Sequence, residues 1–314
     1  MSDGITICIT AYKAKKYIKE TLDSILVQTW FKTHDNYEVL VGIDGCKETL
    51  DYLKTIQENY PHLRVLMMDT NRGTYITTNT LINEAKYNNI IRFDSDDIML
   101  PNMVEKIMRS AENCDIIRYY LQDFGADYKK YISDGSCFFK KNFMLKFGGY
   151  QPWKCSADTE MKKRLRKFGR HKQINDVLFL RRTHNESLTR KPGETTIFGG
   201  AVGDYRKKCL DYVHNLNVRS EKDAKIKMVT NSFTETFNSL DVVSTNYAPE
   251  ILEIIDKIQE EVKITKKINI DEYSELFYMS DNFKENVQKK KIDLKKRMTT
   301  IKRNRVYKQV YYNY

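Results

Sequence analysis

The chain has 314 residues, of which 41% are hydrophobic and 30% are charged, a composition that excludes a disordered or fibrous protein. Its formal charge is +11, but residues 280–314 hold 11 Lys/Arg against 3 Asp/Glu, so the remainder carries only +3. This distribution argues against a domain that grips a nucleic acid duplex, and no nucleic acid partner is expected.

The first hundred residues alternate predicted strands and helices. Apolar runs predict strands at 5–10, 38–43, 63–68 and 90–93, and helical periodicity predicts helices at 17–26, 47–59 and 75–87. This alternation predicts an open α/β sheet, mostly parallel, with helices on both faces. Ligands of such sheets bind beyond the carboxyl ends of the strands.

The second part of the chain has a different character. From about residue 204 onward glycine and proline become rare, and segments such as 224–240 and 249–262 have helical periodicity. We therefore predict a catalytic domain over residues 1–200 and a helical C-terminal region with a basic tail over residues 201–314.

An acidic cluster, Asp94-Ser95-Asp96-Asp97, follows the fourth predicted strand and precedes a helix that begins near Pro101. Three carboxylates this close repel one another unless a cation lies among them, and oxygen ligands suit Mg²⁺ or Mn²⁺. The alternative is a solvated helix N-cap, where Asp is also favoured.

Several segments together resemble the nucleotide-sugar half of the family 2 glycosyltransferases, which have a GT-A fold. The matching segments are 5–12, 17–29, 38–46, Asn71-Arg72-Gly73 and 93–97, and the likeness extends more loosely to about residue 190. The resemblance implies a metal-dependent glycosyltransferase that moves a sugar from a nucleotide-sugar to a glycan, glycolipid or glycoprotein hydroxyl. A UDP-sugar is favoured as donor, with GDP- and dTDP-sugars as alternatives.

The resemblance also implies roles for individual residues. Asp44 would accept a hydrogen bond from the base, Asp94 would face the ribose or the metal, and Asp96 would be the principal ligand of Mn²⁺ or Mg²⁺, with Asp97 supporting it. The implied donor-binding residues are Thr10, Ala11, Tyr12, Asp44, Arg72, Asp94 and Ser95. Where the family has Ala-Arg-Asn, this chain has Thr77-Thr78-Asn79, which leaves Arg72 as a substitute for the family's arginine.

The family's general base lies in an acidic segment at the start of a helix, and here that segment is Ala157-Asp158-Thr159-Glu160. Asp158 is the implied base of an inverting displacement, with Glu160 as second candidate or acceptor contact, whereas a helix-capping Asp158 is the alternative. Trp153 is a candidate to stack on an acceptor sugar, or is part of the core. His184 either completes the metal shell, meets the diphosphate or is structural.

Two other functions remain open. A sugar-1-phosphate nucleotidyltransferase typically needs a glycine-rich phosphate loop after the first strand, but no glycine occurs between Gly4 and Gly42. A catalytically inactive binding module is the second alternative, and the joint presence of Asp44, Asp94, Asp96 and Asp158 argues against it.

Compartment and partners are predicted from the cysteines and the tail. Six cysteines without a C-x-x-C pair predict a reducing compartment and no zinc, and we expect neither a signal peptide nor a spanning helix. A cytoplasmic enzyme is therefore expected. The basic amphipathic tail around Val287, Leu294 and Met298 either lies on an anionic membrane surface, as a lipid-linked acceptor would favour, or packs on the catalytic domain.

Overall fold

The computed structural model describes residues 4–123, 130–182, 184 and 200–238. Within these residues ten strands form one sheet in the order β10-β3-β2-β1-β4-β8-β6-β9-β5, with β7 paired to β6. The strands are β1 (Ile5–Ala11), β2 (Tyr37–Ile43), β3 (Leu63–Met68), β4 (Asn89–Asp94), β5 (Ile98–Met99), β6 (Ile116–Asp123), β7 (Lys130–Ile132), β8 (Cys137–Lys140), β9 (His171–Arg181) and β10 (Phe233–Asn238). The helices are α1 (Ile18–Leu26), α2 (Lys47–Ile56), α3 (Thr74–Glu84), α4 (Met103–Ala111), α5 (Lys141–Phe147), α6 (Ala157–Leu165), α7 (Gly200–Asn215) and α8 (Glu221–Ala224), with 3₁₀ turns at Thr29–Lys32 and Gln57–Asn59.

The first half of the sheet agrees with the prediction. Strands β3, β2, β1 and β4 pair in parallel, and each lies within one residue of its predicted bounds. The second half is mixed, because β8 is antiparallel to both β4 and β6, whereas β6 and β9 are parallel. The predicted α/β fold class is confirmed.

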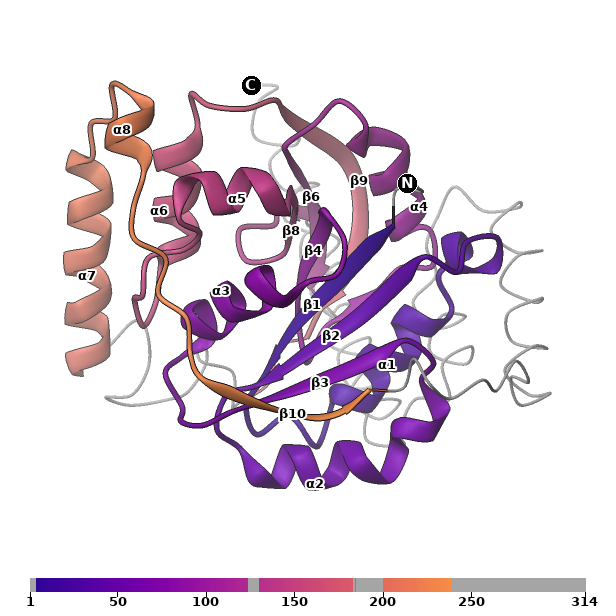
Figure 1. Cartoon of the computed structure of the whole chain (residues 1–314). Coiled ribbons are helices and arrows are strands. Elements are labelled where there is room, and N and C mark those ends of the chain that lie inside the picture. Colours follow the sequence, from indigo (N-terminus) through magenta and orange to yellow (C-terminus); the bar gives the residue numbers. More distant parts are fainter. Residues whose placement is uncertain (1–3, 124–129, 183, 185–199, 239–314) are drawn as a thin grey trace, which may run out of the picture.

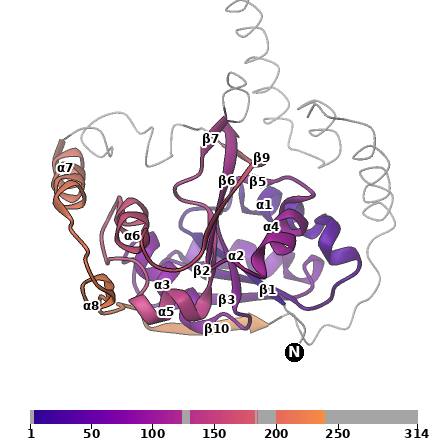
Figure 2. The ribbon, with the colours of Figure 1, turned by 90° about the horizontal axis from the view of Figure 1, so that it is seen from above.

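Helices cover both faces of this sheet. One apolar cluster joins the sheet to α1, α2 and α4, and a second joins the opposite face to α3, α5 and α6. Figure 1 shows α3 and α5 on one side and α2 on the other, and Figure 2 shows the same layers from above. Every residue of β1 is buried, as expected for a central strand that is covered on both faces.

The predicted helix at 224–240 is wrong for the residues that the structure describes. The helix α8 ends at Ala224, residues 225–232 are neither helix nor strand, and β10 then pairs antiparallel with β3. The physical reason is the open hydrogen-bonding edge of β3, which β10 covers. Helical periodicity cannot report such an edge.

Other parts of the C-terminal prediction have different outcomes. The helix α7 agrees with the predicted helical character, and β10 belongs to the central sheet (Figure 1). The segment 249–262 and the basic tail lie outside the described residues. The division at residue 200 stays a prediction. No helix in the described part of the chain combines the length and the apolar character that crossing a membrane requires.

Candidate active site

The predicted donor-binding residues come together at one edge of the sheet. Thr10 lies in register with Gly42 of β2 on one side and with Asp94 of β4 on the other. The parallel strands therefore end at the same edge, and Asp44 and Asp94 flank the end of β1. Tyr12, just beyond β1, is half exposed, whereas Ala11 is buried.

Asp44 organises the loop at residues 69–73. Its carboxylate accepts hydrogen bonds from the backbone N–H groups of Arg72 and Gly73, both at 2.9 Å, and from Thr77 Oγ1 at 3.0 Å. Gly73 has φ +92°, a conformation that glycine adopts without strain. Asp44 is buried and accepts three hydrogen bonds from the protein, so it holds the 69–73 loop against the end of β2. Its predicted bond to a base stays a prediction.

The segment leading into β10 holds the other side of the 69–73 loop. Asn231 Nδ2 donates to the carbonyl of Thr70 at 2.8 Å, and the N–H of Asp69 donates to the carbonyl of Ser232 at 3.1 Å. The Arg72 side chain is exposed and donates to the carbonyl of Thr230 at 3.3 Å. Sequence analysis missed this segment, because it predicted a helix there.

Asp94 is paired with a buried arginine from its own strand. Arg92 Nη2 lies 2.7 Å from Asp94 Oδ1, and Arg92 Nη1 donates to Asp94 Oδ2 at 3.1 Å. Partial burial raises the pKa of the Asp94 carboxyl, and the Arg92 charge opposes that rise. Burial by itself would lower the pKa of Arg92, but Asp94 and the other nearby acidic groups outweigh it, so the pKa is raised. The cation inside the site is thus Arg92, which sequence analysis missed.

The other two carboxylates of the acidic cluster point elsewhere. Asp96 Oδ2 lies 3.0 Å from His184 Nε2. Asp97 is buried and accepts a hydrogen bond from the backbone N–H of Arg182 at 2.8 Å, while the Arg182 side chain donates to the carbonyl of Asp96 and pairs with Glu20. Burial and the charges of its acidic neighbours raise the pKa of Asp97 well above its usual range. Asp97 therefore supports the site indirectly, by tying the end of β9 to the acidic turn.

These residues fit a divalent cation as a partial ligand set. The described residues contain no cluster of three or more candidate metal ligands, but Asp96 and His184 bring a carboxylate oxygen and an imidazole nitrogen to one point. Both oxygens of Asp94 face Arg92 instead. Mg²⁺ and Mn²⁺ sites are commonly completed by substrate phosphates, so a pair of protein ligands is compatible with such a cation.

Asp158 lies in the first turn of α6 and faces the start of α3. Tyr75 Oη donates to Asp158 Oδ1 at 3.0 Å, and this oxygen also accepts from the N–H of Thr159 at 2.8 Å. Burial, and next the Asp158 charge, raise the pKa of Tyr75 well above its usual value, so Tyr75 stays a proton donor. Since Tyr75 follows the 69–73 loop, its hydroxyl connects the two halves of the site. The sequence contained no signal for this contact.

Glu160 does not fit its predicted role. Its side chain is fully buried and pairs with the buried Arg164, whose Nε lies 2.7 Å from Glu160 Oε1. Arg164 also donates to the backbone carbonyls of Phe147 and Ala224. Glu160 is therefore enclosed in the protein and out of reach of an acceptor. The reason is helical spacing, since residues four apart share one face, and here that face packs inward.

The remaining candidates are placed as follows. Trp153 is half-buried, packs against the second apolar cluster and meets the Tyr212 ring edge-on at 5.4 Å. It therefore retains both an apolar contact and an accessible part. Ser95 is half-buried in the acidic turn. Thr10 Oγ1 is hydrogen-bonded to Thr74 Oγ1 at 2.9 Å.

Comparison with known proteins identifies the family. The profile described as Glycosyl transferase family 2 matches residues 6–164. An uncharacterized glycosyltransferase of Haemophilus influenzae is 30% identical over 114 residues, which are 36% of this chain and 34% of that protein. The glycosyltransferase GlyG of Streptococcus pneumoniae is 30% identical over 146 residues, 44% of each protein. The matched part spans less than half the length of these curated relatives.

A solved structure agrees with the fold. Residues 1–349 of S. aureus TarS, in complex with UDP-GlcNAc, give a TM-score of 0.54 at 14% sequence identity, covering 70% of this chain and 69% of that one. At this identity the likeness concerns the fold alone. The family profile covers about half of the chain and decides against the nucleotidyltransferase alternative. The chain belongs to glycosyl transferase family 2.

Proposed function

We propose that this protein transfers a sugar from a nucleoside diphosphate sugar to a hydroxyl acceptor, with inversion at the sugar carbon. The family supports the reaction class, and the structure of TarS with UDP-GlcNAc supports a UDP-sugar as donor. GDP- and dTDP-sugars are the alternatives. A glycan or a lipid-linked saccharide is the proposed acceptor.

One observation carries the proposal: a carboxylate on α6 faces the donor edge of the sheet through a single tyrosine. Tyr75 donates to one oxygen of Asp158, which leaves the other oxygen for an acceptor hydroxyl. The acceptor oxygen forms a bond to the sugar carbon as the bond to the diphosphate oxygen breaks, and the hydroxyl proton passes to Asp158. The nucleoside diphosphate leaves from the opposite side.

Mn²⁺ or Mg²⁺ is the proposed cofactor, held by Asp96 and His184, with Asp94 beside it. When bound, it supplies positive charge next to the leaving diphosphate. His184 is kept in place by the chain before it, since the backbone of Arg182 is bonded to Asp97. The two proposed metal ligands thus come from two places: Asp96 from the turn between β4 and β5, and His184 from the chain just after β9.

The variant Asp158→Asn tests the role of the base. It preserves the size of the side chain and the oxygen that accepts from Tyr75, but it removes the proton acceptor. We expect the release of UDP from UDP-sugars, with or without added saccharide acceptors, to fall by about 100-fold or more. The Kd for UDP with Mn²⁺ should stay within about twofold of the parent value, because Asp158 lies outside the proposed nucleotide pocket.

The matched control is Asp176→Asn, which makes the same change at an exposed carboxylate that pairs with Lys106. Its rate should equal that of the parent. An Asp158→Asn protein that turns over at the parent rate would show that the base is wrongly assigned. Full activity in EDTA would contradict the proposed metal cofactor. Nucleotide binding without turnover of any donor would favour an inactive binding module.

The location of the enzyme is a separate proposal. We infer a cytoplasmic enzyme that touches an anionic membrane surface through its basic tail, supported by the +8 charge of residues 280–314. Flotation with phosphatidylglycerol liposomes should retain the full chain more than a truncation after Met279. Equal partitioning of the two would remove this idea.

A further inference from the structure

Arg92 is a buried cation directly behind the acidic turn. It precedes Asp94 by two residues on β4, so both side chains lie on the same face of the sheet. The Arg92 side chain is only 6% exposed, and its two terminal nitrogens meet the two oxygens of Asp94. Such a two-pronged contact fixes the orientation of a carboxylate, and not only its position.

The same guanidinium reaches the nucleotide side of the site. Arg92 Nη2 donates to Thr74 Oγ1 at 3.2 Å, and Thr74 Oγ1 is bonded to Thr10 Oγ1 at 2.9 Å. Thr10 is the penultimate residue of β1, and Thr74 begins α3, directly after Gly73. Arg92 therefore contacts one implied donor-binding residue directly and a second one through a single hydroxyl.

A tight turn closes over Arg92 from the other side. Ser136 Oγ donates to the Arg92 carbonyl at 2.8 Å. A Cβ atom added at Gly135 would lie 2.8 Å from Arg92 Nη1 and 3.5 Å from Asp94 Oδ2. A side chain at position 135 would therefore require the guanidinium to shift from its present place.

We propose that Arg92 is a positioning residue of the donor site, which holds Asp94 and the Thr74–Thr10 hydroxyl pair in the arrangement that binds the nucleotide. This inference rests on the proposed function. Arg92 Nη1 donates to Asp94 Oδ2, and Arg92 Nη2 lies 2.7 Å from Asp94 Oδ1, so the carboxylate retains lone pairs for a hydroxyl donor such as those of a ribose. Arg92 itself is enclosed and does not touch the donor. It acts through Asp94 and Thr74.

The test uses Arg92→Lys and Gly135→Ala in the full chain. Lysine retains the charge but cannot make the two-pronged contact, whereas alanine at position 135 displaces an intact guanidinium. Both should weaken UDP binding in the presence of Mn²⁺ by roughly tenfold, as expected for the loss of a charge-assisted contact. The ratio of the Kd values for 2′-deoxy-UDP and UDP should fall toward one, because Asp94 loses its orientation. Binding of Mn²⁺ alone should change by less than about twofold.

The matched control is Arg64→Lys, the same change in another, partly buried arginine that pairs with carboxylates. It should lower the thermal midpoint without changing either Kd. Equal UDP affinity in the parent and in Arg92→Lys would overturn the inference, as would an unchanged ratio of the two Kd values. A parent protein that binds none of UDP, GDP and dTDP would overturn the proposed function as well, so the two failures are distinguishable.

Discussion

Arg64 and Arg92 lie level with each other across the sheet, yet their side chains contact opposite ends of α3. In that row Arg92 is level with Cys8, Cys8 with Leu40, and Leu40 with Arg64, and all four point to the face that α3 covers. Arg92 reaches Thr74 at the start of α3, and Arg64 reaches Glu84 at its end.

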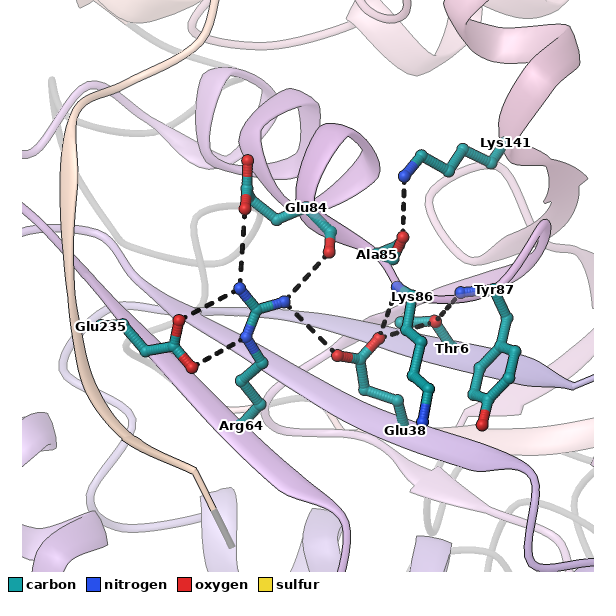
Figure 3. Close-up of polar contacts among 9 residues, drawn as sticks. All are labelled: Thr6, Glu38, Arg64, Glu84, Ala85, Lys86, Tyr87, Lys141 and Glu235. Atoms are coloured by element: carbon teal, nitrogen blue, oxygen red, sulfur yellow. Dashed lines mark hydrogen bonds and ion pairs between the residues drawn. The ribbon is translucent and has the colours of Figure 1, made fainter. Parts of the chain in front are cut away.

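The two clusters differ in whether they contain a buried carboxylate. Around Arg64 lie three glutamates from three elements: Glu38 on β2, Glu84 on α3 and Glu235 on β10 (Figure 3). Glu38 is 1% exposed and is further bonded to Thr6 and to the N–H of Lys86. Asp94, by contrast, is 38% exposed.

Both clusters pair an arginine with carboxylates. Their position along the strands, rather than the type of contact, decides whether the ion pair stabilises the fold or leaves a carboxylate accessible to a ligand. Towards the amino ends of the parallel strands Glu38 is enclosed, and the ion pairs of Arg64 join β3 to β2, α3 and β10. Towards the carboxyl ends, where such sheets bind ligands, the carboxylate retains an accessible side.

The largest expected effect is that of Arg64→Met. Removing this arginine leaves Glu38 buried without its cation, so we expect a loss of about 3 kcal/mol in the free energy of unfolding. Urea denaturation measures it. The Kd for UDP should not change, because Arg64 faces away from the donor edge. A large loss of UDP affinity would contradict the division between the two clusters.

A second variant in the Arg64 cluster, with a smaller expected effect, tests which of its partners contributes most to stability. Glu235 is 39% exposed, so Glu235→Gln should cost less than about 1 kcal/mol. If Glu235→Gln lowers the free energy of unfolding as much as Arg64→Met does, then the contact of Arg64 with β10 stabilises the protein more than its contact with Glu38.

The segment between α8 and β10 connects both regions, and Asn231 tests the connection. Asn231→Ala leaves the carbonyl of Thr70 without its donor, which should cost about 1–2 kcal/mol. The 69–73 loop should also loosen, so UDP affinity should fall together with stability, unlike in the Arg64 variants. Calorimetric titration with UDP and urea denaturation measure the two quantities, and a loss of stability alone would show that the segment only covers an edge.

The control for Asn231→Ala is Asn89→Ala. Asn89 is buried and donates to the carbonyl of Gly4, far along the strands from the donor edge. A comparable loss of stability with unchanged UDP affinity is expected there.

The smallest expected effect is the pH dependence from His62, which precedes β3 near the Arg64 cluster. Burial lowers the pKa of His62, Asp35 opposes this and Lys86 adds to it. The unfolded state therefore takes up the proton first, so stability falls as pH drops through about 6.5 and is unaffected above that value.

His62→Asn should reduce the difference in unfolding free energy between pH 7.5 and pH 5.5. Asparagine tolerates the positive φ of this position, +63°, which separates the loss of the imidazole from backbone strain. An equal pH difference in parent and variant would exclude His62 as its source.

Local patterns were sufficient for the parallel half of the fold. Apolar runs of four to six residues mark β1 to β4, and the acidic turn at the end of β4 lies at the ligand-binding edge, as its position predicted. The resemblance correctly indicated the family. The motif drew attention to Asp158, whose role as base stays a prediction, and it misplaced Glu160, because an acidic residue in a helical sequence does not reveal which face packs inward.

Only the tertiary structure decided which side chains and strands pair with one another. Arg92 and Arg64 are ordinary strand residues in the sequence, and their carboxylates come from positions as distant as Glu235. Tyr75 meets Asp158 across 83 residues, and β10 is a strand because β3 offered an open edge. The sequence by itself determined the strands and helices of the first hundred residues, since these depend on neighbours a few residues away. Which charges meet depends on how those segments pack, and no local pattern records it.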